Sequence, residues 1–333
     1  MPIRQRVFYI VTAILGIALF IGTLTQVGVR EILQHIKVMG WAILLFILLE
    51  GVATVFYAWA TRYCFVPESR TLSLWNLWRI TLSERAISYV TPTGGMGGDV
   101  VKWSIFEQYC SPAEAGSAVV IYKLAYFASK LVFCVLGAVP ILLKISLPKA
   151  LSIPLLVGSI LLGVGLTGFL IFQMKGLFRS GLDHTVGRML GTRVRQWIDR
   201  NVASLDEHLR DYHRGHRRDF WMANLILWCG FTIGGILQAW VFAVVVLKQG
   251  SLFIAFTIWI LGSWVDMVMF AVPAGIGTKE LGRVLIFQAL QFPAAAGAAF
   301  ALILRVEELF WTFVGIALYV FIGPKEKGGK ATK

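Results

Sequence analysis

The stretch Thr91-Pro92-Thr93-Gly94-Gly95-Met96-Gly97-Gly98-Asp99 is a glycine-rich break between two apolar segments, and Lys102 follows it. A second break, Pro273-Ala274-Gly275-Ile276-Gly277-Thr278-Lys279-Glu280, lies 181 positions later and is followed by Arg283. Each break contains a proline and glycines, then an acid, then a base three residues after the acid. This pattern predicts an interrupted helix at both places, with the acid at the start of a short helix.

The same ungapped offset of 181 positions also aligns residues outside the breaks. The aligned pairs include Ala58 with Ala239, Trp59 with Trp240, Trp78 with Trp259, Ile105 with Ile286, Phe106 with Phe287, Pro112 with Pro293 and Gly116 with Gly297. Chance explains some Ala and Gly matches in an apolar chain, but not clustered Pro and Trp matches in one register. We therefore predict two copies of one unit.

Composition points to an integral membrane protein. Of the 333 residues, 57% are apolar and only 15% are charged, with a mean hydropathy of +0.73, which excludes an ordinary soluble domain. In a membrane protein, a net charge of +13 indicates basic cytoplasmic loops that lie next to anionic lipid headgroups. Without a folded basic domain or an RNA-binding motif, nucleic acid is not an expected partner. The four cysteines have no paired spacing, so neither a disulfide framework nor a zinc site is expected.

The expected fold is all-α, with about six full spans and two broken or re-entrant helical hairpins, eight long helices in all. Each hairpin contains a segment too short to cross a hydrocarbon core of about 30 Å at about 1.5 Å per residue. A polar link containing Arg30, Glu31 and Lys37 is expected after a signal anchor at 7–27. The predicted units are 1–40 (signal-anchor helix and link), 41–143 (repeat 1), 144–221 (linking span and basic amphipathic cytoplasmic loop), 222–324 (repeat 2) and 325–333 (Lys-rich cytoplasmic tail).

Charge distribution predicts the topology. The Arg-rich region 173–219 and the Lys-rich tail are expected on the cytoplasmic side of the cell (inner) membrane, and counting the spans places both termini there. An odd number of crossings separates the starts of the two copies, so we expect them to be inverted. Inverted repeats with broken helices near the midplane are typical of alternating-access transporters.

Two interpretations of the breaks remain open. The helix N-terminus after each break favours an anion, and Lys102 or Arg283 would supply a countercharge for a phosphate. Alternatively, Asp99 and Glu280 only cap their helices, while the glycines and prolines supply turns.

A second group of charges lies within apolar helices, where each is expected to face a partner or a wet cavity. Glu50 and Asp266 belong to this group, but the sequence does not pair its members. The predicted substrate-binding residues are Gly94, Gly95, Gly97, Gly98, Asp99, Lys102, Lys123, Lys130, Gly275, Gly277, Lys279, Glu280, Arg283, Arg305, Glu307 and Glu308.

No catalytic, metal-binding or cofactor-binding motif is present in the sequence. His213 and His216 have a spacing that suits a metal, but among so many arginines an interfacial face is the expected interpretation. We therefore expect no catalytic residues, no metal, no cofactor and no enzymatic activity.

The two breaks with Lys102 resemble the signatures of the flippase-like family named for the transmembrane region of lysylphosphatidylglycerol synthase. The resemblance covers nearly all of the chain, and Lys102 departs from it because members often carry Arg there. The resemblance implies that the protein handles a lipid, but it does not identify that lipid. The synthase is associated with an aminoacylated phospholipid, and other members are associated with hopanoid or polyprenyl-linked glycolipid pathways. Because the sequence ends at Lys333, it resembles a stand-alone member, and the aminoacyltransferase activity is expected to be absent.

The function expected from these features is movement of an anionic or phosphate-bearing lipid between leaflets. In this hypothesis the bases neutralise the phosphate, while Asp99, Glu280, Glu307 and Glu308 balance them, bind a cationic part of the headgroup or carry coupling protons. One alternative is a membrane-embedded transferase acting on a lipid phosphate, with Asp99 or Glu84 as base. Another is a scaffold for lipid-biosynthesis enzymes, which are also candidate partners of a transporter.

Overall fold

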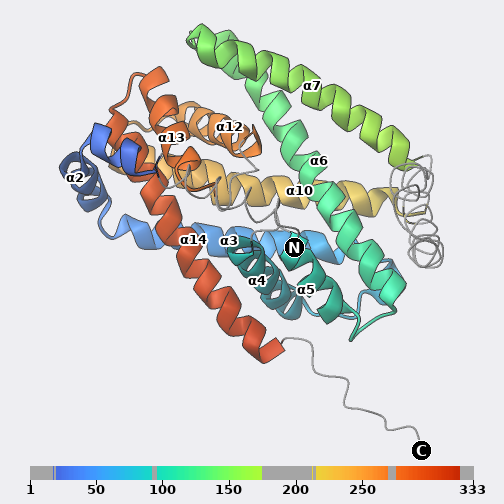
Figure 1. Ribbon diagram of the computed structural model, residues 1–333. Coiled ribbons are helices and arrows are strands. Elements are labelled where there is room, and N and C mark those ends of the chain that lie inside the picture. Colours follow the sequence, from blue (N-terminus) through green and yellow to red (C-terminus); the bar gives the residue numbers. More distant parts are fainter. Residues whose placement is uncertain are drawn as a thin grey trace, which may run out of the picture.

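The computed structural model describes residues 18, 20–91, 96–174, 212, 215–268 and 275–322. These residues form helices and connecting turns without any strand, so the all-α prediction is confirmed for them (Figure 1). The elements are α2 (Val29–Met39), α3 (Ala42–Arg62), a 3₁₀ turn (Pro67–Ser69), α4 (Leu74–Val90), α5 (Met96–Phe106), α6 (Pro112–Lys144), α7 (Lys149–Met174), α10 (Arg217–Phe231), a π-helical segment (Thr232–Leu237), α11 (Gln238–Val245), α12 (Leu252–Val268), α13 (Thr278–Ala289) and α14 (Ala294–Ile322).

Several predictions concern residues outside these ranges. They include most of the anchor 7–27, of which 20–27 are helical, nearly all of the basic loop 173–219, and the Lys-rich tail. Pro92 to Gly95 and the segment 269–274, which contains Pro273 and Ala274, also lie outside the described residues.

The polar link expected after the anchor is helix α2 instead. Ile32 and Met39 lie two turns apart on the same face and are buried, whereas Glu31 and Lys37 are exposed. This separation of apolar and charged side chains is that of an amphipathic helix packed on a protein surface. The sequence predicted a polar link because the charged residues of this short segment obscure the spacing of its apolar residues.

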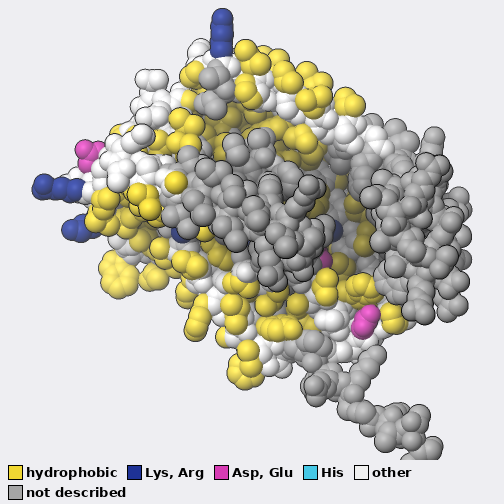
Figure 2. Space-filling model, in the orientation of Figure 1, with side chains coloured by type: hydrophobic (Ala, Val, Ile, Leu, Met, Phe, Trp, Pro, Cys, Tyr) yellow, Lys and Arg dark blue, Asp and Glu magenta, His cyan; other side chains and the backbone are white. Residues whose placement is uncertain are grey.

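Three helical stretches of the described chain are long and apolar enough to cross a membrane: Ala42–Arg62, Pro112–Lys144 and Arg217–Val245. The last is continuous because the π-helical segment joins α10 to α11. Helix α6 starts as the sequence predicts, with Pro112 in its first turn, and Ser111 and Glu114 form a capping box there. The outer surface is also suited to lipid: Trp41 is 88% exposed, and apolar side chains cover much of the described part of the face in Figure 2.

The helix boundaries follow the 181-residue offset. Shifted by 181, Leu74–Val90 becomes 255–271, and the structure has α12 at Leu252–Val268. In the same way α5 corresponds to α13 and α6 to α14, while α3 corresponds to the continuous stretch α10–α11. Each copy therefore consists of a long helix, a shorter helix, a helix of 11 or 12 residues after the break, and a second long helix.

The helices of the two copies contact one another reciprocally: α3 packs on its own counterpart, and α4 and α6 each pack on the counterpart of the other. Helix α3 packs on α10, α4 packs on α14, and α6 packs on α12. Two hydrogen bonds show that α3 and α10–α11 are antiparallel: the Tyr212 hydroxyl donates to the Tyr63 carbonyl at 2.6 Å, and Gln238 Nε2 donates to the Phe46 carbonyl at 2.9 Å. The end of α3 thus lies at the beginning of α10, as Figure 1 also shows.

Close packing between copies depends on a glycine of α14. A Cβ at Gly315 would lie 2.3 Å from the Leu82 carbonyl oxygen and 2.7 Å from the Ala86 side chain, both on α4. The Gly315 carbonyl also accepts a hydrogen bond from Ser83 at 3.2 Å. The backbones of α14 and α4 therefore meet almost directly.

We expect Gly315→Ala to separate α14 from α4 and to lower stability by about 1–3 kcal/mol, as overpacking of a close contact does. Gly165→Ala on α7 is the matched control, because a Cβ there meets nothing within 4 Å. Thermal unfolding of the purified protein in detergent measures both. Equal midpoints for the two variants would contradict this packing.

Candidate functional site

The first break is followed by direct contact between α5 and α4. A Cβ at Gly98 would lie 2.1 Å from the Glu84 carbonyl oxygen, and one at Gly97 would lie 2.4 Å from Thr91 Oγ1. Both glycines therefore bring the short helix against α4. Gly94 and Gly95, also predicted to bind substrate, lie outside the described residues.

Lys102 is fully buried on α5. Its Nζ donates to Glu84 Oε2 at 3.2 Å and to Thr61 Oγ1 at 3.4 Å, and lies 3.6 Å from the centre of the Tyr122 ring. The carboxylate, the hydroxyl and the ring neutralise and solvate the ammonium group. In this conformation Lys102 holds α5 to α4, and its role toward a phosphate stays a prediction.

Asp99 pairs with a base on the following long helix. Its Oδ1 accepts a hydrogen bond from Lys123 Nζ at 2.9 Å, and the same Nζ lies 4.0 Å from Glu84 Oε1. The side chains of Asp99 and Lys123 are 22% and 31% exposed, so this pair is more accessible than Lys102. The structure thus brings three predicted residues, Asp99, Lys102 and Lys123, to one carboxylate, Glu84.

The second break turns through two glycines with positive φ, Gly275 at 60° and Gly277 at 77°. Glu280 Oε2 accepts a hydrogen bond from the Gly277 backbone nitrogen at 2.7 Å, which caps α13 as one interpretation expected. Its other oxygen pairs with Arg305 Nε on α14 at 2.8 Å, and Arg305 Nη2 donates to the Gly275 carbonyl at 2.8 Å. Arg305 therefore fixes both the turn and the cap.

Arg283 makes a two-pronged ion pair with Asp266 on α12. Its Nη1 and Nη2 lie 2.9 Å and 2.7 Å from the two carboxylate oxygens, and Nη1 also donates to the Gly262 carbonyl at 3.1 Å. Like Lys102, Arg283 is buried. This bidentate geometry requires a guanidinium, so Lys102 and Arg283 are not interchangeable.

The two breaks are held by equivalent ion pairs. In each copy the acid of the short helix pairs with a base on the next long helix: Asp99 with Lys123, and Glu280 with Arg305. The base three residues later pairs with an acid on the preceding helix: Lys102 with Glu84, and Arg283 with Asp266. The partners on the neighbouring helices are displaced by one residue from the 181 offset, so sequence alignment alone does not find them.

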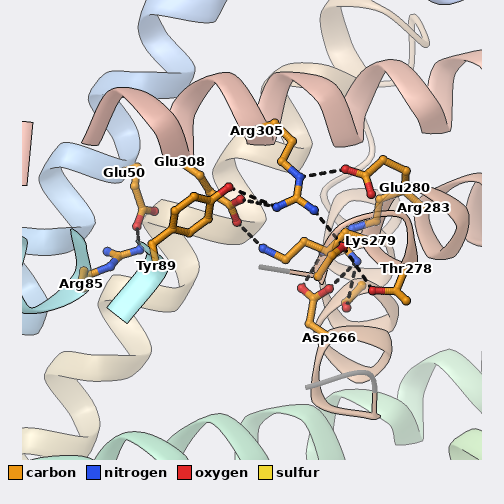
Figure 3. Close-up of polar contacts among 12 residues, drawn as sticks. Glu50, Arg85, Tyr89, Asp266, Thr278, Lys279, Glu280, Arg283, Arg305 and Glu308 are labelled. Atoms are coloured by element: carbon orange, nitrogen blue, oxygen red, sulfur yellow. Dashed lines mark hydrogen bonds and ion pairs between the residues drawn. The ribbon is translucent and has the colours of Figure 1, made fainter. Parts of the chain in front are cut away.

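Further polar contacts extend from the second break, and the one between Arg305 and Tyr89 joins the two copies (Figure 3). Arg305 Nη1 lies 3.3 Å from the Tyr89 hydroxyl of α4, and it also lies 3.2 Å from Glu308 Oε2. Glu308 also accepts a hydrogen bond from Lys279, and Glu50 on α3 pairs with Arg85 on α4 at 2.6 Å. Tyr89 and Arg85 were not predicted as site residues, because nothing in the sequence shows that α4 of one copy faces α14 of the other.

Among the described charges around the breaks, two have no ion pair. Lys130 on α6 lies 5.9 Å from the centre of the Trp259 ring, and Glu307 on α14 is only 5% exposed. The other cations of this group, Arg85, Lys102, Lys123, Lys279, Arg283 and Arg305, each pair with a carboxylate. Arg79 also lacks an ion pair, but it lies on the second turn of α4, close to the polar turn before that helix.

The described residues contain no group of three His, Cys, Asp or Glu side chains that could hold a metal. His216 lies 3.4 Å from Asp219, whereas His213 is outside the described ranges. Burial raises the pKa of the Cys64 thiol to about 12 and that of Cys110 to about 11, so both remain protonated at neutral pH. Neither of these two thiols is a ready nucleophile.

Helices α6 and α7 enclose an apolar groove with a volume of about 650 Å³. Val135 and Leu142 line it from α6, and Leu156 and Ile160 line it from α7. Its polar side chain, Ser159, donates a hydrogen bond to the Leu155 carbonyl at 2.6 Å. The lining is therefore apolar apart from Ser159, whose hydroxyl is already engaged in a hydrogen bond.

We expect Glu84→Gln to lower the free energy of unfolding by about 3–5 kcal/mol, because it leaves the Lys102 charge buried without a counter-ion. Adding Lys102→Met should restore part of that loss, since it removes the uncompensated charge. Glu68→Gln, an exposed carboxylate before α4, is the control and should leave unfolding unchanged. Chemical denaturation in detergent measures the free energy of unfolding of all three. If Glu84→Gln were as stable as wild type, Glu84 would not be the counter-ion that Lys102 requires.

Comparison with known proteins supports a membrane-lipid context. The model of the family described as the lysylphosphatidylglycerol synthase TM region matches residues 8–315. No curated protein and no solved structure matches the chain. Because the match covers nearly the whole sequence, the chain belongs to the lysylphosphatidylglycerol synthase TM-region family.

Proposed function

We propose that this protein moves a lipid with a phosphate-bearing headgroup between the two leaflets of the cell membrane. The observation that carries the proposal is the equivalent pairing of charges at both breaks, in two copies whose first long helices are antiparallel. Charges within apolar spans are expensive, by about 2.5–3.5 kcal/mol each on insertion scales, and mark polar paths through membrane proteins. Family membership supplies the lipid context.

In this proposal the two copies are inverted repeats. The antiparallel contact of α3 with α10–α11 supports it, because a two-fold axis in the membrane plane relates such helices. The reciprocal contacts of α4 with α14 and of α6 with α12 follow from the same axis. One break then faces the cytoplasm and the other the opposite side, with both termini cytoplasmic as the positive charges favour.

Lys130 is the proposed anchor for the phosphate. Its ammonium lacks a carboxylate partner among the described residues and lies on the face of Trp259. A phosphate oxygen would provide the missing counter-ion, and the indole would remain in contact with the cation. The more exposed pairs, Asp99 with Lys123 and Lys279 with Glu308, would exchange partners with the headgroup as it passes.

The alternatives from the sequence receive no specific support. Asp99 and Glu84, the bases that a transferase would use, are each held by a lysine. A scaffold for lipid-biosynthesis enzymes does not require ion pairs repeated at two helix breaks. The absence of a nucleotide-binding motif from the sequence argues against direct use of ATP.

We expect Lys130→Gln to slow lipid exchange about tenfold or more, because a hydrogen bond to a charged group contributes about 1.5–3 kcal/mol. The assay is leaflet exchange of a fluorescent anionic phospholipid in liposomes that contain the purified protein. Lys144→Gln is the matched control: Lys144 also lies on α6 with its Nζ 5.2 Å from the centre of an aromatic ring of α12, Phe253, but it is exposed at the helix end. Its rate should equal that of wild type.

One outcome would count against transport, and another would count against Lys130 as the anchor. If the wild-type protein exchanges no phospholipid that is tried, and instead turns over a lipid-phosphate donor, the transferase is favoured. If Lys130→Gln and Lys144→Gln behave alike, Lys130 is not the anchor.

The inverted arrangement predicts access to the two breaks from opposite sides. Single cysteines at Gly95 and Ile276, in a background without the four native cysteines, should react with an impermeant maleimide from different sides of the membrane. Whole cells and inside-out vesicles provide the two directions of labelling. Labelling of both positions from the same side would refute the inverted repeat.

A further inference from the structure

Glu307 differs from the other described carboxylates around the breaks, because it has neither an ion pair nor a hydrogen bond. Glu50, Glu84, Asp99, Asp266, Glu280 and Glu308 each contact a lysine or an arginine. Glu307 lies in the middle of α14 and is 95% buried. It is therefore the carboxylate of this group with the least compensation by protein or by water.

The charged groups that act electrostatically on Glu307 come from four helices. They are Glu50 on α3, Arg85 on α4, Lys279 on α13 and Glu308 on α14 itself. The two cations are already used: Arg85 pairs with Glu50 and Lys279 pairs with Glu308. Helix α2 also packs on α14, but its charged residues Arg30, Glu31 and Lys37 are exposed and His35 is half-buried. Glu307 therefore experiences two acids and two bases, and both bases are already paired with those acids.

An ionised carboxylate in this position would be unstable. Removing such a group from water without a partner costs many kcal/mol, and the usual response is neutralisation by a proton. Its neighbours Glu50 and Glu308 add repulsion, whereas a lipid ammonium group is too large to reach a side chain that is 95% buried. The ligand that fits this site is a proton.

Glu307 is also placed where movement of the two copies would change its surroundings. It lies between Arg305, which holds the second break, and Trp311, whose Nε1 donates to the Ile47 carbonyl on α3 at 3.0 Å. Of the two bases nearby, Arg85 is the more exposed, because its side chain is 43% exposed and that of Lys279 is 25% exposed. A shift of α4 against α14 would bring Arg85 or water to Glu307, and either would release the proton.

We propose that Glu307 is a proton-binding site that couples lipid movement to a transmembrane proton gradient, an inference that rests on the proposed function. A proton from one side of the membrane bonds to a carboxylate oxygen of Glu307 in the conformation described here. It leaves to water on the other side when the copies rearrange, so no bond other than this O–H bond forms or breaks. One proton moves for each cycle of the carrier.

The first test observes the proton itself and does not depend on transport. Infrared spectra of the protein in liposomes at neutral pH should contain the carbonyl band of a protonated carboxylic acid. Glu307→Gln should remove that band, because glutamine has the same size but binds no proton, whereas Glu31→Gln on the exposed face of α2 should retain it. A wild-type spectrum without the band, or a Glu307→Gln spectrum that keeps it, would overturn the proposal.

The second test measures coupling with the same liposomes under a gradient of about one pH unit, which biases each coupled proton about tenfold. Wild type and Glu31→Gln should exchange the fluorescent anionic phospholipid faster with one direction of the gradient than with the other. Glu307→Gln should exchange at one rate whatever the gradient. Coupling would be overturned if Glu307→Gln still responded to the direction of the gradient, or if wild type exchanged lipid without responding to it. If wild type exchanged no lipid at all, the proposed function itself would be overturned.

Discussion

The structure depends on the requirement that a charge within the membrane has a partner. Family membership and the apolar surface place this chain in lipid, yet its helices carry charges that would each be costly alone. The solution is local and occurs twice: the acid and the base at the start of each short helix pair with the helices on either side of it. Each short helix is thereby connected to a 17-residue helix before it and to a long helix after it.

The glycines serve the same requirement. Glu84 can reach Lys102 because Gly98 allows α5 to touch the backbone of α4, where any Cβ would collide with the Glu84 carbonyl. In the second copy, the turn through Gly275 and Gly277 directs one backbone nitrogen to Glu280 and one carbonyl to Arg305. Backbone groups freed by a helix break are costly in a membrane unless the protein satisfies them. Glycine, ion pair and break are therefore parts of one arrangement.

The sequence predicted this arrangement in outline. Proline, glycine and tryptophan matches identified the offset that the helix boundaries follow, and Pro112 marked the start of α6 correctly. The pairing of charges could not be predicted, because Glu84 and Lys123 are each one residue out of register with Asp266 and Arg305. The helix α2 was not recognised, since two buried residues in an exposed charged segment give a weak pattern. Contacts such as that of Tyr89 with Arg305 join residues more than 200 positions apart, and no local pattern encodes them.

The two unpaired charges also have no like-charged counterpart in the other copy. Shifted by 181 positions, Lys130 aligns with Trp311, and its ring partner Trp259 aligns with Trp78. Trp311 and Trp78 indeed contact edge to face, with ring centres 6.3 Å apart, so an indole occupies in one copy the place of the ammonium in the other. Glu307 likewise aligns with Tyr126, whose ring packs on Phe231. Charges present in both copies belong to the scaffold that holds the breaks, because both copies need it. Lys130 and Glu307 have neither a counterpart in the other copy nor an ion pair among the described residues, so that scaffold does not explain them. In the proposed function, a substrate phosphate and a proton are the partners that would complete them.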